Sequence, residues 1–89
     1  MNICFDIDGC LINEKGKAIE ENCELMLKLC NSHKVYLWSG NGFDYAYKIA
    51  KEWNLLHKIS GVLDKYNTFK PDIAFDNQEI DLGKLNIVI

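Results

Sequence analysis

Short apolar segments that alternate with helix-patterned segments constrain the fold of this chain more than any other feature. The first, residues 2–7, is an apolar run closed by Asp8-Gly9, which predicts a buried strand. Similar short runs follow at 35–38, 73–75 and 86–89, and a weaker strand pattern lies at 58–62. Apolar residues recur at helical spacing over 19–31 and 42–53. Strands alternating with helices are typical of βαβ units. We therefore expect an α/β fold: a small Rossmann-like parallel sheet of about five strands with two main helices.

Length and charge limit the kinds of protein this chain can form. Its 89 residues fit a single domain, 1–89, with one core. The net charge of −3 comes from thirteen acidic residues against ten lysines, with no arginine. This balance argues against a basic nucleic-acid-binding patch and against a polybasic membrane surface.

Other sequence signals bear on the compartment. No apolar run approaches the roughly 18 residues of a membrane-spanning helix, and the first residues do not resemble a signal peptide. The four cysteines include no Cys-x-x-Cys pair, and neither histidine stands at ligand spacing, which argues against a zinc site. We expect a cytoplasmic protein with buried thiols and no membrane partner.

Polar residues end three of the expected strands. The first ends in Asp6-x-Asp8, the second in Ser39 and the fourth in Asp76-Asn77. Ligands of open parallel sheets bind at the carboxyl ends of the strands, which meet at one edge of the sheet. A single Asp at a strand end is often only a turn former, but three polar strand ends in so small a domain predict a site.

This pattern resembles the haloacid dehalogenase-like superfamily, whose four motifs would cover nearly the whole chain. The matching segments are Asp6-Ile7-Asp8-Gly9-Cys10-Leu11, Ser39 in Tyr36-Leu37-Trp38-Ser39-Gly40-Asn41, Lys70-Pro71, and Ile73-Ala74-Phe75-Asp76-Asn77 with Asp81 shortly after. The four motifs occur in the family's order, each at the expected place relative to the strands. The first motif alone is moderately specific, and all four together are strongly so.

The resemblance implies a Mg²⁺-dependent phosphatase that hydrolyses a phosphate monoester through an aspartyl-phosphate. Asp6 would be the nucleophile, and Asp8 would protonate the leaving oxygen and then act as a base on water. Asp6, Asp76 and the backbone carbonyl of Asp8 would hold the Mg²⁺. The alternative is a catalytically weak or inactive domain of the same fold that serves as a binding or regulatory module.

The resemblance also assigns residues to the phosphate. Ser39 and Gly40 would bind phosphoryl oxygens, and Lys70 would neutralise developing charge. Two alternatives stay open: Ser39 could instead cap the helix that begins near residue 42, and Lys65 is a rival for the role of Lys70.

Two further residues surround the expected metal ligands. Asn77 stands where a second acid is commoner, which would weaken the hydrogen bonding around those ligands, and Asp81 is a candidate source of the missing charge. The intervals after the first and second motifs leave no room for a cap domain. We therefore expect a capless site, open to a large phosphorylated substrate or closed by a neighbouring subunit.

The links between strands predict a homo-oligomer. Right-handed crossovers place both helices on one face of the sheet. The links 63–72 and 77–85 are too short for a helix that covers the other face, yet the strands look apolar on both faces. A second subunit would cover the exposed face. Trp38 and Trp53 are expected in the core.

Overall fold

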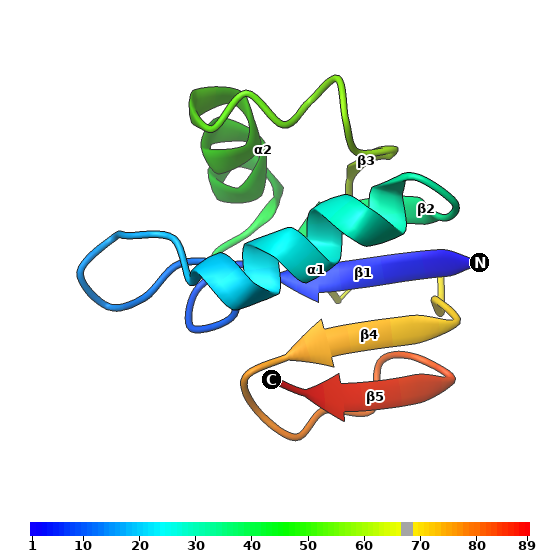
Figure 1. Ribbon diagram of the computed structural model, residues 1–89. Coiled ribbons are helices and arrows are strands. Elements are labelled where there is room, and N and C mark those ends of the chain that lie inside the picture. Colours follow the sequence, from blue (N-terminus) through cyan, green and yellow to red (C-terminus); the bar gives the residue numbers. More distant parts are fainter. Residues whose placement is uncertain (67–68) are drawn as a thin grey trace.

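Five parallel strands form one sheet in the computed structural model, which describes residues 1–66 and 69–89 (Figure 1). The strand order is β3-β2-β1-β4-β5. The strands are β1 (Asn2–Asp6), β2 (Lys34–Trp38), β3 (Gly61–Val62), β4 (Ile73–Asp76) and β5 (Leu85–Val88), and the helices are α1 (Glu20–Cys30) and α2 (Phe43–Glu52). The expected α/β class, with a five-stranded parallel sheet and two helices, is confirmed.

The third strand is much shorter than the sequence predicts. The sequence predicts a weak strand over residues 58–62, but only Gly61 and Val62 pair with β2. The N–H groups of Lys58 and Ile59 donate instead to the Leu55 carbonyl, at 2.8 and 3.0 Å, in a turn that follows α2. Local hydrogen bonds therefore prevail over strand pairing for the first part of this segment.

Both helices pack on the same face of the sheet, as the crossover rule predicts. Phe5 of β1 and Phe75 of β4 stack there with ring centroids 4.5 Å apart. The main core also contains Ile3, Val35 and Leu37 from the strands, Met26 from α1, and Ala46 and Ala50 from α2. This core holds the carboxyl ends of the central strands in a fixed arrangement.

The opposite face of the sheet is covered by the chain itself. Cys4 and Ala74 are fully buried there, and Trp38 is 1% exposed. The hydrophobic residues packed against them are Tyr36, Leu63, Ile80 and Leu82. The premise that this face needs a second subunit is therefore wrong, because irregular segments of the chain cover it without a helix. The homo-oligomer stays a prediction, but an uncovered sheet face no longer supports it.

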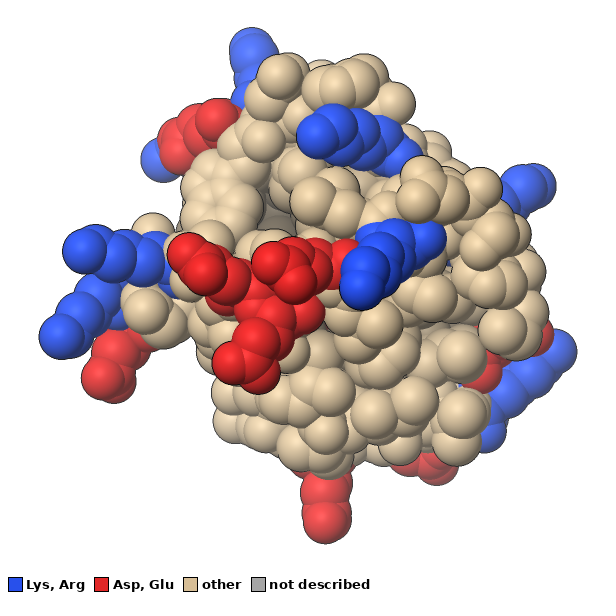
Figure 2. Space-filling model, in the orientation of Figure 1, with Lys and Arg blue, Asp and Glu red and all other residues tan. Residues whose placement is uncertain are grey.

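The charged residues at the two ends of helix α1 stabilise the helix. Glu20 and Glu21 lie in its first turn and Lys28 in its last, the arrangement that a helix dipole favours. Figure 2 shows acidic side chains gathered over the N-terminal half of α1 and lysines dispersed over the rest of this face. In the part of the chain that the structure describes, no helix is long and apolar enough to cross a membrane.

The contacts of Asp72 at the amino edge of the sheet predict how stability changes in acid. Asp72 accepts the Asn2 N–H at 2.8 Å and pairs with Lys84 at 3.4 Å. The Asn2 hydrogen bond is the main cause that lowers the pKa of Asp72 below its ordinary 3.8, and Lys84 adds to it. A lowered pKa stabilises the fold above pH 3.8, and this contribution is lost as the pH falls through the folded value. We expect Asp72→Asn to lower the urea midpoint at pH 7 by an amount that shrinks on acidification.

Asp81 provides the control for this prediction. It is exposed, so Asp81→Asn should leave the midpoint unchanged at both pH values. Equal midpoints for wild type and Asp72→Asn at pH 7 would show that the carboxylate of Asp72 contributes nothing to the fold.

Candidate active site

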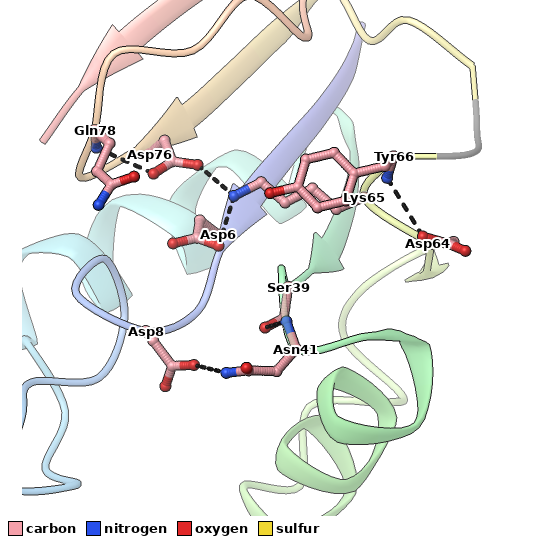
Figure 3. Close-up of polar contacts among 9 residues, drawn as sticks. All are labelled: Asp6, Asp8, Ser39, Asn41, Asp64, Lys65, Tyr66, Asp76 and Gln78. Atoms are coloured by element: carbon pink, nitrogen blue, oxygen red, sulfur yellow. Dashed lines mark hydrogen bonds and ion pairs between the residues drawn. The ribbon is translucent and has the colours of Figure 1, made fainter.

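Two buried carboxylates converge on one lysine at the carboxyl edge of the sheet (Figure 3). Asp6 ends β1 and Asp76 ends β4, each one residue beyond the paired Phe5 and Phe75. The Nζ atom of Lys65 lies 3.2 Å from Oδ1 of Asp6 and 2.8 Å from Oδ2 of Asp76. The parallel pairing of β1 and β4 thus joins acids that stand seventy residues apart (76 − 6) in the sequence.

Burial and charge act in opposite directions on this cluster. Burial is the largest influence on Asp6 and raises its pKa; Lys65 lowers that pKa and Asp76 raises it further, so the net pKa lies above 3.8. Burial lowers the pKa of Lys65, but the hydrogen bonds and charges of the two carboxylates outweigh it and leave the pKa above 10.5. Lys65 is therefore protonated at neutral pH, and its single positive charge faces two carboxyl groups.

The lysine at the acids is Lys65, and Lys70 is not part of the site. Lys70 is exposed and lies outside the groove at the acids. The backbone explains the difference, because Leu63 N–H pairs with the Leu37 carbonyl and carries the chain out at the carboxyl edge just before Lys65. Asp72 N–H pairs with the Asn2 carbonyl, so Lys70 lies close to the amino edge instead. Of the two lysines left open by the sequence, the structure brings only Lys65 to the acids.

Asp8 lies apart from the Lys65 cluster and has its own partners. Its Oδ2 accepts a hydrogen bond from the Asn41 side chain at 2.8 Å, which Figure 3 shows, and its Oδ1 accepts one from the Tyr45 hydroxyl at 2.6 Å. Burial, with the hydrogen bond to Asp8, raises the pKa of Tyr45 to about 12, so the phenol stays a donor. Neither partner is part of a motif that the sequence shows. Their only signal is their position, two and six residues after Ser39.

Ser39 directly follows β2, and its side chain accepts a hydrogen bond in the turn before α2. It is buried, and its Oγ accepts the Asn41 N–H at 3.0 Å, which leaves the hydroxyl hydrogen available to donate. The N-cap of α2 is Gly42, with no side-chain cap bond, so the capping alternative for Ser39 is wrong. Gly40 lines the groove beside the Tyr66 hydroxyl, which would lie 3.4 Å from a Cβ added at Gly40.

Position 9 requires glycine because of its backbone conformation and because the Asn77 side chain lies close to it. Its φ of +80° is unfavourable for other residues, and an added Cβ would lie 2.3 Å from Nδ2 of Asn77. Asn77 thus packs on the turn that follows Asp8 and lines the groove, whereas Asp81 is exposed and does not line it. Of the two residues expected around the metal ligands, only Asn77 is close to the acids.

The acids can be tested as ligands of the Mg²⁺ that the resemblance implies. Within residues 1–66 and 69–89, no group of three or more His, Cys, Asp or Glu side chains converges as a metal site. The expected set needs only two, because Mg²⁺ is commonly held by one or two carboxylates, with water and phosphate completing its shell. Asp6 and Asp76 both contact one cationic atom, so their oxygens face a common point. The oxygen donors are of the type that Mg²⁺ prefers, but the Lys65 ammonium occupies the point between them, so Mg²⁺ held by both carboxylates would replace that contact.

Two of the four thiols, those of Cys4 and Cys10, are buried as the sequence predicts, whereas Cys23 and Cys30 are half-buried. All four cysteines are free. Burial raises the pKa of both buried thiols to about 12, so they are not thiolates at neutral pH. The two buried thiols are therefore not candidate nucleophiles at neutral pH.

Comparison with known proteins leaves the site to be interpreted from its own chemistry. No protein-family model matches this chain, and no curated protein or solved structure is significantly similar to it. The function must therefore be argued from the residues at the carboxyl edge and their geometry.

Proposed function

We propose that this protein is a Mg²⁺-dependent phosphatase that hydrolyses a phosphate monoester through an aspartyl-phosphate on Asp6. The observation that carries the proposal is the lysine bridge between Asp6 and Asp76 at the end of adjacent parallel strands. A nucleophilic carboxylate, a second carboxylate and a fixed positive charge are the groups that attack on phosphorus requires. Ser39, at the end of the next strand, adds a hydroxyl donor.

In the first step, an oxygen of Asp6 forms a bond to phosphorus as the bond from phosphorus to the leaving oxygen breaks. Lys65 already contacts Oδ1 of Asp6 and would neutralise charge on the phosphoryl group. The Ser39 hydroxyl and the backbone N–H of Gly40 would donate to phosphoryl oxygens. Asp8, held by Asn41 and Tyr45, would transfer a proton to the leaving oxygen.

In the second step, water regenerates the enzyme. Asp8, now ionised, takes a proton from the water, whose oxygen attacks phosphorus and displaces the Asp6 carboxylate. Inorganic phosphate leaves, and both acids return to their starting states. Bound Mg²⁺, held by Asp6, Asp76 and the backbone carbonyl of Asp8, would supply positive charge against the repulsion between these acids and a phosphate dianion.

A phosphate-release assay tests the proposal directly. Sugar phosphates, nucleotides, phosphopeptides and 3′-phosphorylated DNA should be compared with and without Mg²⁺. We expect turnover of at least one ester that requires Mg²⁺, and Mg²⁺-dependent binding of beryllofluoride on Asp6, which mimics the phosphorylated carboxylate. No turnover together with no beryllofluoride binding would refute the phosphatase.

A binding or regulatory module is the second candidate function. The observation in its favour is that Lys65 already contacts both acids, so the fold neutralises part of their charge without metal. Such a module would bind phosphate esters without hydrolysing them. Ligand-induced shifts in melting temperature without phosphate release would identify it.

The phosphatase proposal predicts that Mg²⁺ stabilises the fold. Binding to the folded state alone adds about 1.4 kcal/mol at ten times the dissociation constant. For a domain of this size, that raises the melting temperature by roughly 5–10 °C. Asp76→Ala should abolish the increase, because it removes one of the two carboxylates that face the common point.

Calorimetry with a MgCl₂ titration measures this effect, and NaCl at equal ionic strength is the control for screening. Asp81→Ala is the matched variant, since Asp81 is exposed and outside the groove. It should keep the full Mg²⁺ response. An unchanged melting temperature for the wild type would favour the binding module.

A further inference from the structure

The candidate active site opens into a groove of about 1040 Å³ that extends between the 9–19 segment and α2. Its lining includes Asp6, Ser39 and Lys65 of the site. It also includes Ile19 of the loop and residues of α2 and its C-terminal end. The groove is therefore much larger than a phosphate group requires and has room for the rest of a substrate.

The α2 wall of the groove is aromatic and apolar. Tyr45, Ile49 and Trp53 all line it, and their spacing of four residues places them on one side of the helix. Ile49 and Trp53 are half-buried: they pack against the main core and keep part of their surface in the groove. Trp53 was expected only in the core. Its position in the groove is a consequence of where α2 packs.

This wall begins at the proposed general acid. Tyr45 donates its hydroxyl hydrogen to Asp8 at 2.6 Å, so the oxygen that Asp8 would protonate lies next to Tyr45. A phosphate at Asp6 and Lys65 would then direct the leaving group along Tyr45 toward Ile49 and Trp53. The contacts of Asp8 thus determine which part of the substrate faces the apolar wall.

The charges along the groove are acidic. Glu14 of the loop and Glu52 of α2 line it in addition to the three aspartates. Among the described lining residues, Lys65 is the single lysine, and it already pairs with Asp6 and Asp76. Lys48 lies 3.9 Å from Glu52, but both side chains are more than half exposed, so this pair is weak. A second phosphate or carboxylate in the leaving group would meet repulsion here.

We propose that the groove binds the leaving group of the substrate, and that this group is an aromatic or similarly apolar moiety carrying a positive charge. The inference rests on the proposed phosphatase function for the placement of the phosphate. Tyr45, Ile49 and Trp53 bind the apolar part, and Glu14 and Glu52 favour an ammonium over a carboxylate. Bisphosphorylated sugars and polynucleotides are disfavoured by the same charges.

Two matched esters test the charge preference. Tyramine O-phosphate carries an ammonium, and the O-phosphate of 3-(4-hydroxyphenyl)propanoate carries a carboxylate at nearly the same distance from a similar phenol. We expect kcat/KM for the ammonium ester to exceed that for the carboxylate ester by about tenfold at low ionic strength. The ratio should fall as salt is added.

Substitutions assign the preference to the groove. The double variant Glu14→Gln, Glu52→Gln should reduce the ratio to below about threefold. The double variant Glu21→Gln, Glu24→Gln is the control, because these acids are exposed on α1 and do not line the groove. It should keep the wild-type ratio. Trp53→Leu should raise KM for both esters and leave their ratio unchanged, with circular dichroism confirming that the variant folds.

A binding measurement separates this inference from the proposed chemistry. Tyramine and 3-(4-hydroxyphenyl)propanoate, which lack phosphate, are titrated while NMR follows the indole N–H of Trp53. Tighter binding of tyramine supports the groove even if neither ester is hydrolysed, in which case only the phosphatase fails. Hydrolysis of both esters at equal rates, or equal binding of both phenols, refutes the groove inference and leaves the phosphatase standing.

Discussion

Asp6→Asn should lower phosphatase turnover by about 10³-fold or more while the protein stays folded. An amide oxygen is a poor nucleophile toward phosphorus and a poor ligand for Mg²⁺, whereas Asn has nearly the same shape as Asp. Lys65 would keep its 2.8 Å contact with Asp76, so the site would retain an ion pair. The loss should therefore appear in kcat and not as unfolding.

The same variant should be more stable than the wild type in Mg²⁺-free buffer at neutral pH. The pKa of Asp6 is raised, chiefly by burial, so the folded state holds a proton in a pH range where the unfolded state has lost it. Stability therefore falls as the pH rises from 3.8 through the folded pKa, and the deficit persists at neutral pH. Asn does not titrate, so Asp6→Asn should lack this loss.

Urea unfolding between pH 4 and pH 8, combined with the phosphate-release assay, measures both effects. Asp81→Asn is the control and should change neither, since Asp81 is exposed and outside the groove. Undiminished turnover in Asp6→Asn would end its assignment as the nucleophile. A variant that is inactive and also less stable would show that Asp6 contributes to the fold as an ionised partner of Lys65.

Lys65→Met should destabilise the fold by about 3–5 kcal/mol, the usual cost of removing one partner from a buried ion pair. The side chain of Lys65 is only 8% exposed, and both of its partners are buried carboxylates. Methionine fills much of the same volume but leaves both acids without a positive charge. A domain of this size has roughly 5–13 kcal/mol of stability in total, so the effect is large.

Lys70→Met is the matched comparison, because Lys70 is exposed and outside the groove. It should change the free energy of unfolding by less than about 0.5 kcal/mol. Adding Asp6→Asn to Lys65→Met should recover part of the loss by removing one unpaired charge. Equal effects of the two lysine substitutions would contradict the assignment of Lys65 to the acids.

The placement of the carboxylates at the edge of the sheet could be predicted from the sequence. A short apolar run that ends in Asp6 or Asp76 predicts a buried strand with an acid at its carboxyl end, because local pattern and strand length determine this. Once the strands are known to alternate with helices, the parallel sheet follows, and parallel strands bring their carboxyl ends to one edge. The neighbourhood of Asp6, Ser39 and Asp76 follows from these local rules.

The identity of the lysine could not be predicted in the same way. Lys65 and Lys70 lie in one irregular segment, where no periodicity tells which side chain turns inward. The decision comes from backbone pairing between distant residues: Leu63 with Leu37 at one end and Asp72 with Asn2 at the other. These pairs place Lys65 at the carboxyl edge and Lys70 near the amino edge.

The cover of the second sheet face and the partners of Asp8 also needed the tertiary structure. The short links after β3 and β4 cannot form helices, but Leu63, Ile80 and Leu82 still cover Cys4, Trp38 and Ala74. Tyr45 reaches Asp8 because α2 packs on β2, which lies beside β1 in the sheet. The sequence by itself determined the strands, the helices and the acids that end the strands, since these depend on local patterns. Packing between distant segments decided that Lys65 and Tyr45 contact those acids and that Trp53 lines the same groove.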